Sequence, residues 1–301
     1  MEKDKIKKGK KFEYKKNSKS YKSLMAWKKY REILKNIKVI DPACGSGAFL
    51  IQALNYLVEE GNKVNKVIME FQGGTGELFT LKADILKNNL YGVDINRESV
   101  EITKLSLWLN SVRKEEKLTS LDDHIKCGNS LFFDWHDEFK EIFENGGFDV
   151  VIGNPPYVRQ ERITEIKSEL EGNYKTYSGT CDLFVYFYEL GYNILKDGGY
   201  LGYITSNKWM RARYGGNLRE FLKENVLIKE IVDLGGAKIF EDAIVDTNIL
   251  IFKKEDDKEI IGNSKFKAVL FNDFKNDEEF EEYIKNKGFT MCQNSLSKED
   301  G

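Results

Sequence analysis

The sequence has little proline, cysteine or histidine and almost no net charge. It contains 3 Pro, 4 Cys and 2 His in 301 residues, and its formal net charge at pH 7 is −2. Scattered cysteines without a Cys-x-x-Cys pair, together with so few histidines, exclude a disulfide framework and a zinc site of the usual spacing, so no metal is expected. The small net charge excludes a global field that attracts a polyanion, so any such binding requires a local basic patch.

Long apolar runs are also missing. No run approaches the ~20 residues that a membrane-spanning helix needs, and no signal-peptide pattern opens the chain. We therefore expect a cytoplasmic protein without membrane contacts. Its 41% hydrophobic residues are enough for one large core, or for one core and a small appendage.

Short apolar runs alternate with longer amphipathic segments, a pattern typical of βαβ units and a mostly parallel sheet. The link at 235–246 is too short for the crossover helix of a parallel pair, so the last strand should run antiparallel. We predict an α/β fold with a seven-stranded sheet and a helix over 21–35. The expected strands are residues 37–40, 90–95, 125–127, 148–152, 200–206, 228–234 and 247–253.

All three prolines fall inside two motifs, residues 41–47 and 154–157. The first motif, Asp-Pro-Ala-Cys-Gly-Ser-Gly, ends a predicted strand and opens a helix, where glycines let a ligand approach the backbone closely. Leu50 stands where a dinucleotide fingerprint has its third glycine. This difference favours a nucleoside with an amino-acid tail over a pyrophosphate. The alternative is an ordinary tight turn.

Two more polar residues follow neighbouring predicted strands. Asp94, followed by Ile95, ends the second strand, where an acid commonly binds ribose hydroxyls. Asn129 follows the third strand, and its amide can both donate to and accept from an adenine edge. The alternatives are a surface carboxylate and an ordinary Gly-Asn turn.

The second motif, Asn-Pro-Pro-Tyr, follows the buried strand at 148–152. An aromatic exocyclic amine is a poor nucleophile because its lone pair is delocalised into the ring. The Asn154 side-chain oxygen and the Pro155 carbonyl can accept both of its N–H groups, while Tyr157 offers a stacking face. The alternative is a rigid loop with a structural asparagine.

The two motifs, in this order, resemble those of γ-class N6-adenine-specific DNA methyltransferases from restriction–modification and phage-defence systems. The resemblance runs from about Trp27 to Lys254, and is strongest to type IIG-like proteins, whose methylase and nuclease can share one polypeptide. It implies a Rossmann-like, S-adenosylmethionine-dependent methyltransferase fold with an antiparallel last strand. It also implies site-specific methyl transfer from S-adenosylmethionine to the N6 amine of an adenine flipped out of double-stranded DNA.

The resemblance also carries site roles. It makes residues 154–157 (Asn154, Pro155, Pro156 and Tyr157) the catalytic loop and Phe240 an aromatic that packs on the flipped adenine, although an Ile-Phe pair near a strand is as often core. Many relatives carry Asp where Asn129 stands. The implied cofactor-binding residues are Asp41, Pro42, Ala43, Cys44, Gly45, Gly47, Asp94, Ile95, Asn129 and Pro156.

The predicted domains are a basic helical lead-in (1–36), the methyltransferase catalytic domain (37–254), and a linker or start of a target-recognition region (255–301). The family's Thr-Pro-type turn over the methionine end of the cofactor has no match in 1–36, and no nuclease-like motif is present. We therefore expect the catalytic core of something larger, with a target-recognition domain or subunit and a nuclease outside this chain.

A basic–aromatic segment at 208–214 supplies the expected DNA contacts, Lys208, Arg211 and Arg213. Cations beside aromatic residues suit a surface that follows a phosphate backbone and stacks on bases. The alternative is an amphipathic helix start with a solvated face. Two other functions stay open: a protein methyltransferase that acts on a glutamine amide, and a non-catalytic fragment that binds DNA or a partner.

Overall fold

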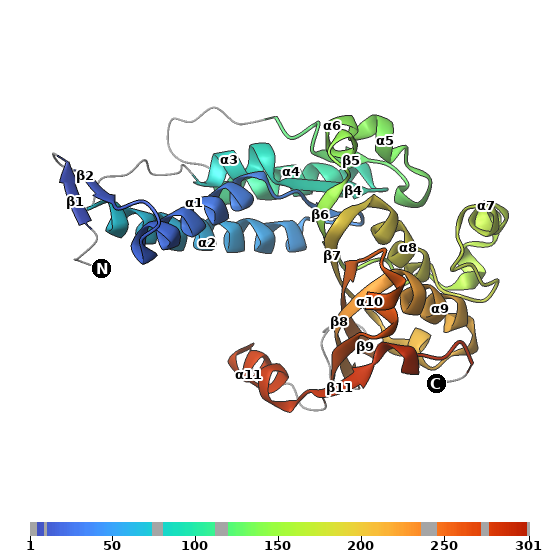
Figure 1. The fold of residues 1–301 in the computed structure, drawn as a ribbon. Coiled ribbons are helices and arrows are strands. Elements are labelled where there is room, and N and C mark those ends of the chain that lie inside the picture. Colours follow the sequence, from blue (N-terminus) through green and yellow to red (C-terminus); the bar gives the residue numbers. More distant parts are fainter. Residues whose placement is uncertain are drawn as a thin grey trace. The chain divides into compact units, whose positions relative to one another are not determined.

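The computed structural model describes residues 5–8, 11–73, 81–111, 120–235, 246–271 and 277–299 (Figure 1). The chain divides into two compact units, and each is described by itself. The first comprises Met1–Val39, Cys44–Gly92 and Asn96–Cys127; the second comprises Ile40–Ala43, Val93–Ile95 and Gly128–Gly301.

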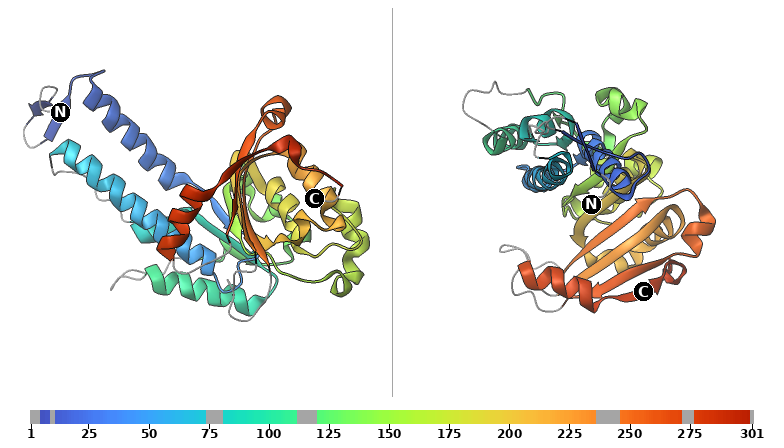
Figure 2. Two further views of the ribbon diagram at one scale, coloured as in Figure 1. Left: turned by 90° about the horizontal axis from the view of Figure 1, so that it is seen from below. Right: turned by 60° about the vertical axis from the view of Figure 1, so that its left-hand side comes forward.

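The first unit is mainly helical. Its helices α1 and α2 run side by side (Figure 2), and the buried residues of α2, such as Leu50, Leu54 and Leu57, recur at helical spacing on one face. The Asn89 amide donates to the carbonyls of Leu34 and Ile37, which fixes the end of α1. The elements are β1 (Lys5–Lys8), β2 (Lys11–Tyr14), α1 (Lys19–Asn36), α2 (Ala48–Gln72), α3 (Leu81–Asn88), α4 (Arg97–Ser111) and β5 (Ile125–Cys127).

A nine-stranded sheet has the strand order β11-β10-β8-β9-β7-β6-β3-β4-β5. All seven predicted strands are present. Strand β9 runs antiparallel to both β7 and β8, as predicted, while β6 is parallel to β7. The bounds are β3 (Val39–Asp41), β4 (Leu90–Asp94), β6 (Phe148–Gly153), β7 (Leu195–Ser206), β8 (Val226–Gly235), β9 (Thr247–Lys254), β10 (Lys265–Leu270) and β11 (Phe289–Cys292).

The sheet is wider than predicted by two strands, β10 and β11. Strand β10 pairs in parallel with β8, and β11 pairs antiparallel with β10. Their sequences are short and partly polar, so they lack the continuous apolar run that marks the central parallel strands. Both lie within residues 255–301, and the three-part division of the chain stays a prediction.

Helices cover both faces of the sheet in the second unit. On one face α8 packs against β7 at Gly191, where a β-carbon would lie 2.3 Å from Leu201. On the other, Phe280, Tyr283 and Ile284 of α11 pack on Val232 and neighbouring core residues. The helices are α5 (Trp135–Glu138), α6 (Lys140–Glu144), α7 (Lys167–Asn173), α8 (Phe184–Ile194), α9 (Gly216–Asn225), α10 (Lys258–Gly262) and α11 (Asp277–Lys287).

Candidate functional site

A pocket of about 260 Å³, the strand-end pocket, lies where β3, β4 and β6 end. All of its lining residues belong to the second unit. In open α/β sheets, ligands bind outside the carboxyl ends of the strands, so this is the expected position for a site. The lining residues are Pro42, Ala43, Asp94, Ile95, Gly128, Asn129, Ser130, Leu131, Asn154, Pro156, Leu183 and Phe187.

The first proline motif supplies one wall of this pocket through Pro42 and Ala43. Its backbone is held from two sides: the Ser130 hydroxyl donates to the Pro42 carbonyl at 2.5 Å, and Oδ1 of Asp41 accepts the Ala43 N–H at 3.0 Å. Asp41 itself is buried and does not line the pocket. The loop therefore presents fixed backbone to a ligand.

The rest of this motif, Cys44, Gly45 and Gly47, belongs to the first unit and is not among the lining residues. Gly47 caps α2 with φ +86°, and a β-carbon there would lie 3.0 Å from the Thr103 side chain. The Thr103 hydroxyl donates to the Gly45 carbonyl at 2.7 Å. The glycines thus permit a tight turn against α4, and their predicted contact with a cofactor stays a prediction.

Asp94 and Ile95 form a second wall. The Asp94 carbonyl accepts the Gly128 N–H at 2.9 Å, which joins the end of β4 to the turn after β5. The Ile95 side chain is 71% exposed although it is large and apolar. An exposed isoleucine at a pocket rim suits contact with a flat ligand, and the carboxylate beside it suits hydroxyl groups.

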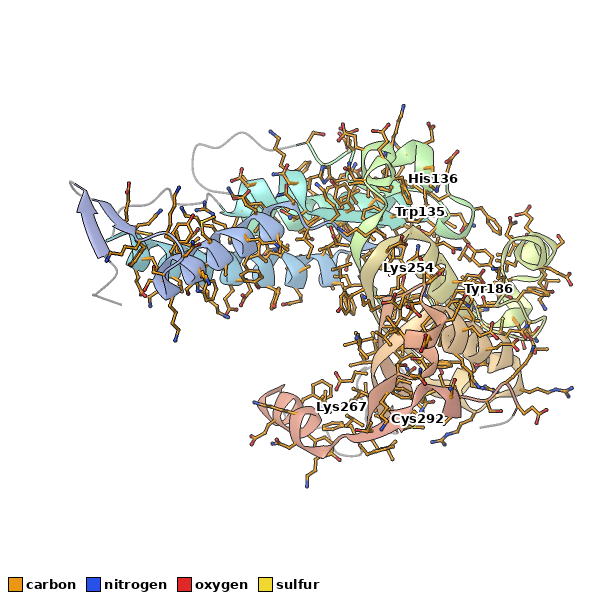
Figure 3. All side chains as sticks on the ribbon, in the orientation of Figure 1. Trp135, His136, Tyr186, Lys254, Lys267 and Cys292 are labelled. Atoms are coloured by element: carbon orange, nitrogen blue, oxygen red, sulfur yellow. The ribbon has the colours of Figure 1, made fainter. Side chains whose placement is uncertain are left out.

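Asn129 lines the third wall as the cap of a short turn. Its Oδ1 accepts the Leu131 N–H at 3.2 Å, which leaves the amide nitrogen and the second lone pair of Oδ1 to meet a ligand. Trp135, labelled in Figure 3, donates its indole N–H to the Ser130 carbonyl at 3.0 Å and braces the same turn. The predicted contact of this amide with an adenine edge stays a prediction.

The second proline motif closes the pocket with Asn154 and Pro156, while Pro155, between them in the chain, is buried and is not a lining residue. Oδ1 of Asn154 is buried and has no hydrogen-bond partner among the described residues, and no other lining residue carries such an atom. A buried acceptor without a partner costs about 1–3 kcal/mol, so it marks a place where a donor from a ligand is expected.

Tyr157 does not line the pocket. Its hydroxyl donates to the Ile204 carbonyl at 3.4 Å, its ring lies 6.0 Å from that of Phe184, and burial raises its pKa. The ring is therefore half-buried against the fold. Its predicted stacking on a base stays a prediction.

The basic–aromatic segment follows β7, as predicted, in two short turns at Asn207–Met210 and Arg213–Gly215. Lys208, Arg211 and Arg213 are exposed, and Arg211 lies 3.7 Å from the Asp233 carboxylate. Their contact with DNA stays a prediction. Phe240 lies outside the described residues.

Five lining residues were not predicted: Gly128, Ser130 and Leu131 flank Asn129, while Leu183 and Phe187 come from the N-cap and first turn of α8. The last two are the informative ones. They stand four positions apart, so they lie on one helical face. In the sequence, Phe187 forms part of a regular apolar face, which predicts core packing and carries no sign of a pocket.

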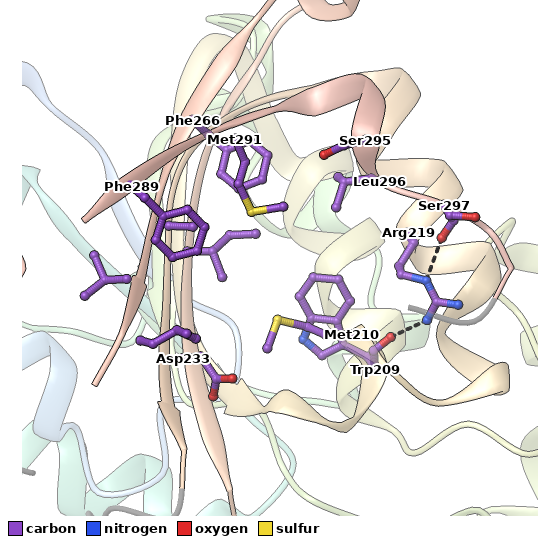
Figure 4. Close-up of a pocket in the computed structure, with 14 residues that line it drawn as sticks. Trp209, Met210, Arg219, Asp233, Phe266, Phe289, Met291, Ser295, Leu296 and Ser297 are labelled. Carbon is purple, nitrogen blue, oxygen red and sulfur yellow. Dashed lines mark hydrogen bonds between the residues drawn. The ribbon is translucent and has the colours of Figure 1, made fainter. Parts of the chain in front are cut away.

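A second pocket of the same volume, the apolar pocket, lies on the sheet face of β8, β10 and β11 (Figure 4). Apolar side chains, including Ile231, Phe289 and Met291, make up most of its lining. Arg219 borders it and donates to the carbonyls of Trp209 at 2.6 Å and Ser297 at 2.7 Å. Of the predicted site residues that the structure describes, none lines it.

Within the described ranges, no group of three or more His, Cys, Asp or Glu side chains could hold a metal ion. No described helix is long and apolar enough to cross a membrane.

Comparison with known proteins gives one family. The family model of the Eco57I restriction-modification methylase matches residues 88–240. The type II restriction enzyme and methyltransferase RM.Eco57I of Escherichia coli is 32% identical over 255 residues, which cover 74% of this chain and 25% of that protein. The chain spans between 25% and 36% of the length of three such curated relatives.

Solved structures share the fold. A methyltransferase subunit of a type I restriction-modification system from Streptococcus thermophilus superposes with a TM-score of 0.57 at 17% identity, covering 97% of this chain and 57% of that one. The type IIL restriction-modification enzyme MmeI, solved in complex with DNA, gives a TM-score of 0.63 at 16% identity, covering 91% and 37%. The predicted methyltransferase fold is confirmed. Methyltransferases of this kind generally use S-adenosylmethionine. The chain belongs to the Eco57I restriction-modification methylase family.

Proposed function

We propose that the protein transfers a methyl group from S-adenosylmethionine to the N6 amine of an adenine flipped out of double-stranded DNA. It would serve as the methylase part of a restriction–modification or phage-defence system. The observation that carries this proposal is Oδ1 of Asn154, a buried acceptor without a partner among the described residues, in a pocket at the strand ends.

The walls of the strand-end pocket suit the cofactor, which when bound supplies an electrophilic methyl group. The Asp94 carboxylate would accept from the ribose hydroxyls, and the Asn129 amide nitrogen would donate to the adenine ring. Ile95 and Phe187 offer apolar surface for the two faces of that ring, and the fixed backbone at Pro42–Ala43 admits the amino-acid tail. No metal is needed for this assignment.

The loop at 154–157 would hold the acceptor. Two oxygens, Oδ1 of Asn154 and the Pro155 carbonyl, would accept both N–H groups of the amine and draw its nitrogen toward a tetrahedral geometry. The two prolines fix this loop, so little reorganisation is needed during transfer. No base is required before the methyl group moves, because the methylated amine loses its proton to water afterwards.

DNA would be held by exposed cations after β7. Lys208 and Arg213 lie in the two short turns there and Arg211 lies between them, and such side chains neutralise phosphates. MmeI, which shares the fold, was solved with DNA. Because the curated relatives are much longer than this chain, target recognition and any nuclease would come from other domains or subunits. A DNA substrate also makes the cytoplasm the expected compartment.

A transfer assay with isotopically labelled methyl donor tests the proposal. Unmethylated genomic DNA and a glutamine-bearing release factor are offered separately, and the DNA is digested to nucleosides for mass spectrometry. We expect label in N6-methyladenine alone. Label in the release factor would favour the glutamine-amide alternative, which the family assignment does not support. Absence of both transfer and cofactor binding at millimolar concentration would favour an inert fragment.

A further inference from the structure

The side chain of Asp41 occupies a position behind the strand-end pocket that neither motif explains. It ends β3, is 1% exposed, and is absent from the pocket lining although Pro42 and Ala43 next to it line the wall. A carboxylate so buried needs partners to offset its desolvation. Its surroundings therefore indicate what it does.

Toward the cofactor side, Asp41 holds the loop. Its Oδ1 accepts the Ala43 N–H at 3.0 Å, a bond within one short turn that fixes the backbone presented to the pocket. This contact acts on the shape of the wall and needs an acceptor oxygen, which an aspartate, a protonated aspartic acid or an asparagine can each supply.

Toward the substrate side, Asp41 meets Gly153, the last residue of β6 and the one directly before Asn154. Strands β3 and β6 are neighbours in the sheet. A β-carbon on Gly153 would lie 2.7 Å from Oδ1 of Asp41, closer than real β-carbon contacts, and 3.2 Å from its carboxyl carbon, which is tight. The carboxyl group thus fills the space that a side chain at position 153 would need.

The buried surroundings of this carboxyl group change its pKa. Burial raises the pKa of Asp41 to about 7, the Ala43 N–H lowers it and the Asp94 charge raises it. Tyr203 pairs with Gly153 in the parallel ladder, and its hydroxyl is buried without a partner among the described residues. A group placed this deeply acts on packing and loop geometry more readily than on solvent or ligand.

We propose that Asp41 is a positioning residue, whose buried carboxyl group sets the spacing between the wall at Pro42–Ala43 and the loop that begins at Asn154. The proposal rests on the proposed function, since these walls would hold the methyl donor and the amine. It differs from the role that the family resemblance implies for Asp41, that of a direct cofactor contact. Misplacement of reacting groups by ~1 Å can cost 100-fold in rate.

Four variants test this inference: Asp41→Ala, Asp41→Asn, Gly153→Ala and the double variant Asp41→Ala/Gly153→Ala. Gly172→Ala is the matched control, because a β-carbon at that glycine meets nothing within 4 Å. For each, kcat for DNA methylation is measured at saturating donor, the Kd for S-adenosylmethionine is measured by calorimetry, and a thermal melt checks folding.

We expect Asp41→Ala and Gly153→Ala each to lower kcat by ~10–100-fold while changing the cofactor Kd much less. Asp41→Asn keeps the acceptor and the shape, so its kcat should stay close to wild type. The double variant should lose much less than the product of the two single losses, because removing the carboxyl group makes room for the added methyl. The backbone at Gly153 has φ +157°, so alanine at 153 is strained there in both Gly153→Ala and the double variant. This strain is the same in the two variants, so it cancels when their losses are compared in the double-mutant cycle.

Two results would overturn the inference: multiplicative losses in the double variant, or equal weakening of cofactor binding by Asp41→Ala and Asp41→Asn with kcat unchanged. The second result would make Asp41 a direct ligand through its charge. If Gly153→Ala does not fold but the double variant does, the contact between the two residues is supported. If neither folds, the kcat values of Asp41→Ala and Asp41→Asn decide the inference. A wild-type protein inactive on all adenine-containing DNA contradicts the proposed function instead.

Discussion

The two pockets of the second unit have the same volume, about 260 Å³, but they are built in different ways. The strand-end pocket is lined mostly by residues of the loops that follow strands, such as Ala43, Asn129 and Asn154. The apolar pocket is lined by the side chains that strands place on a sheet face, such as Ile231 and Met291. The loops after parallel strands all leave at one edge, so that edge collects polar groups from distant parts of the chain. Position in the fold therefore identifies the candidate site, and volume does not.

The variant Asn154→Ala should have the largest effect and best tests whether the strand-end pocket, and not the apolar pocket, carries the methyl-transfer activity. Loss of the acceptor should lower the methylation rate by ~1,000-fold, the upper scale for removing one preorganised polar contact from a transition state. Cofactor affinity, measured by calorimetry, should stay nearly unchanged. Turnover close to wild type in this variant would rule out Asn154 as the acceptor for the amine.

A pH dependence should come from the acid behind the strand-end pocket. The pKa of Asp41 is about 7 in the folded protein against an ordinary 3.8, so the folded state holds a proton that the unfolded chain releases. Stability from this group is therefore full at low pH and falls as the pH rises toward 7. The free energy of unfolding, measured with urea, should fall for wild type by roughly 2–3 kcal/mol more between pH 5 and pH 8 than it does for Asp41→Asn, because asparagine cannot ionise. Parallel curves for the two proteins would contradict a buried acid here.

A smaller effect is expected from Asp94→Ala. Losing a charged hydrogen-bond partner should weaken S-adenosylmethionine binding by ~1–3 kcal/mol, measured as Kd by calorimetry. The same substitution at the exposed Asp123 is the matched control and should leave the Kd unchanged. Equal affinities for both variants would remove Asp94 from the cofactor site.

The apolar pocket should give the smallest effect. Met291→Ala enlarges the apolar pocket, and Met291 is not a lining residue of the strand-end pocket. The cofactor Kd and the methylation rate of this variant should therefore both match wild type. A Kd weakened as much as in Asp94→Ala would show that the two pockets do not act separately.

Sequence patterns predicted the parts of the fold that depend on local alternation. The seven strands and the placement of both proline motifs at strand ends were predictable, because apolar runs and turn residues mark them directly. Strands β10 and β11 were not, because β10 pairs with β8 and not with β9, the strand before it in the chain, and because its own residues are partly charged.

The site was predictable where a short motif carries the chemistry, as at Asn154, and where a polar residue ends a strand, as at Asp94. Phe187 was not, because an aromatic on an apolar helical face looks the same whether it meets core or ligand. The burial of Tyr157 against Phe184 and the contact of Asp41 with Gly153 both depend on how neighbouring elements pack, which no motif encodes.

Arg219 has a practical consequence for work with this protein. Its guanidinium donates to the carbonyls of Trp209 and Ala212 in the basic–aromatic segment, and also to those of Ser297 and Lys298. A purification tag, fusion partner or cut placed at 297–298 would therefore disturb a turn far earlier in the chain. Arg219 also donates to the Glu299 carbonyl at 3.4 Å, so we expect DNA-binding assays to depend on the position of that junction, which belongs beyond Glu299.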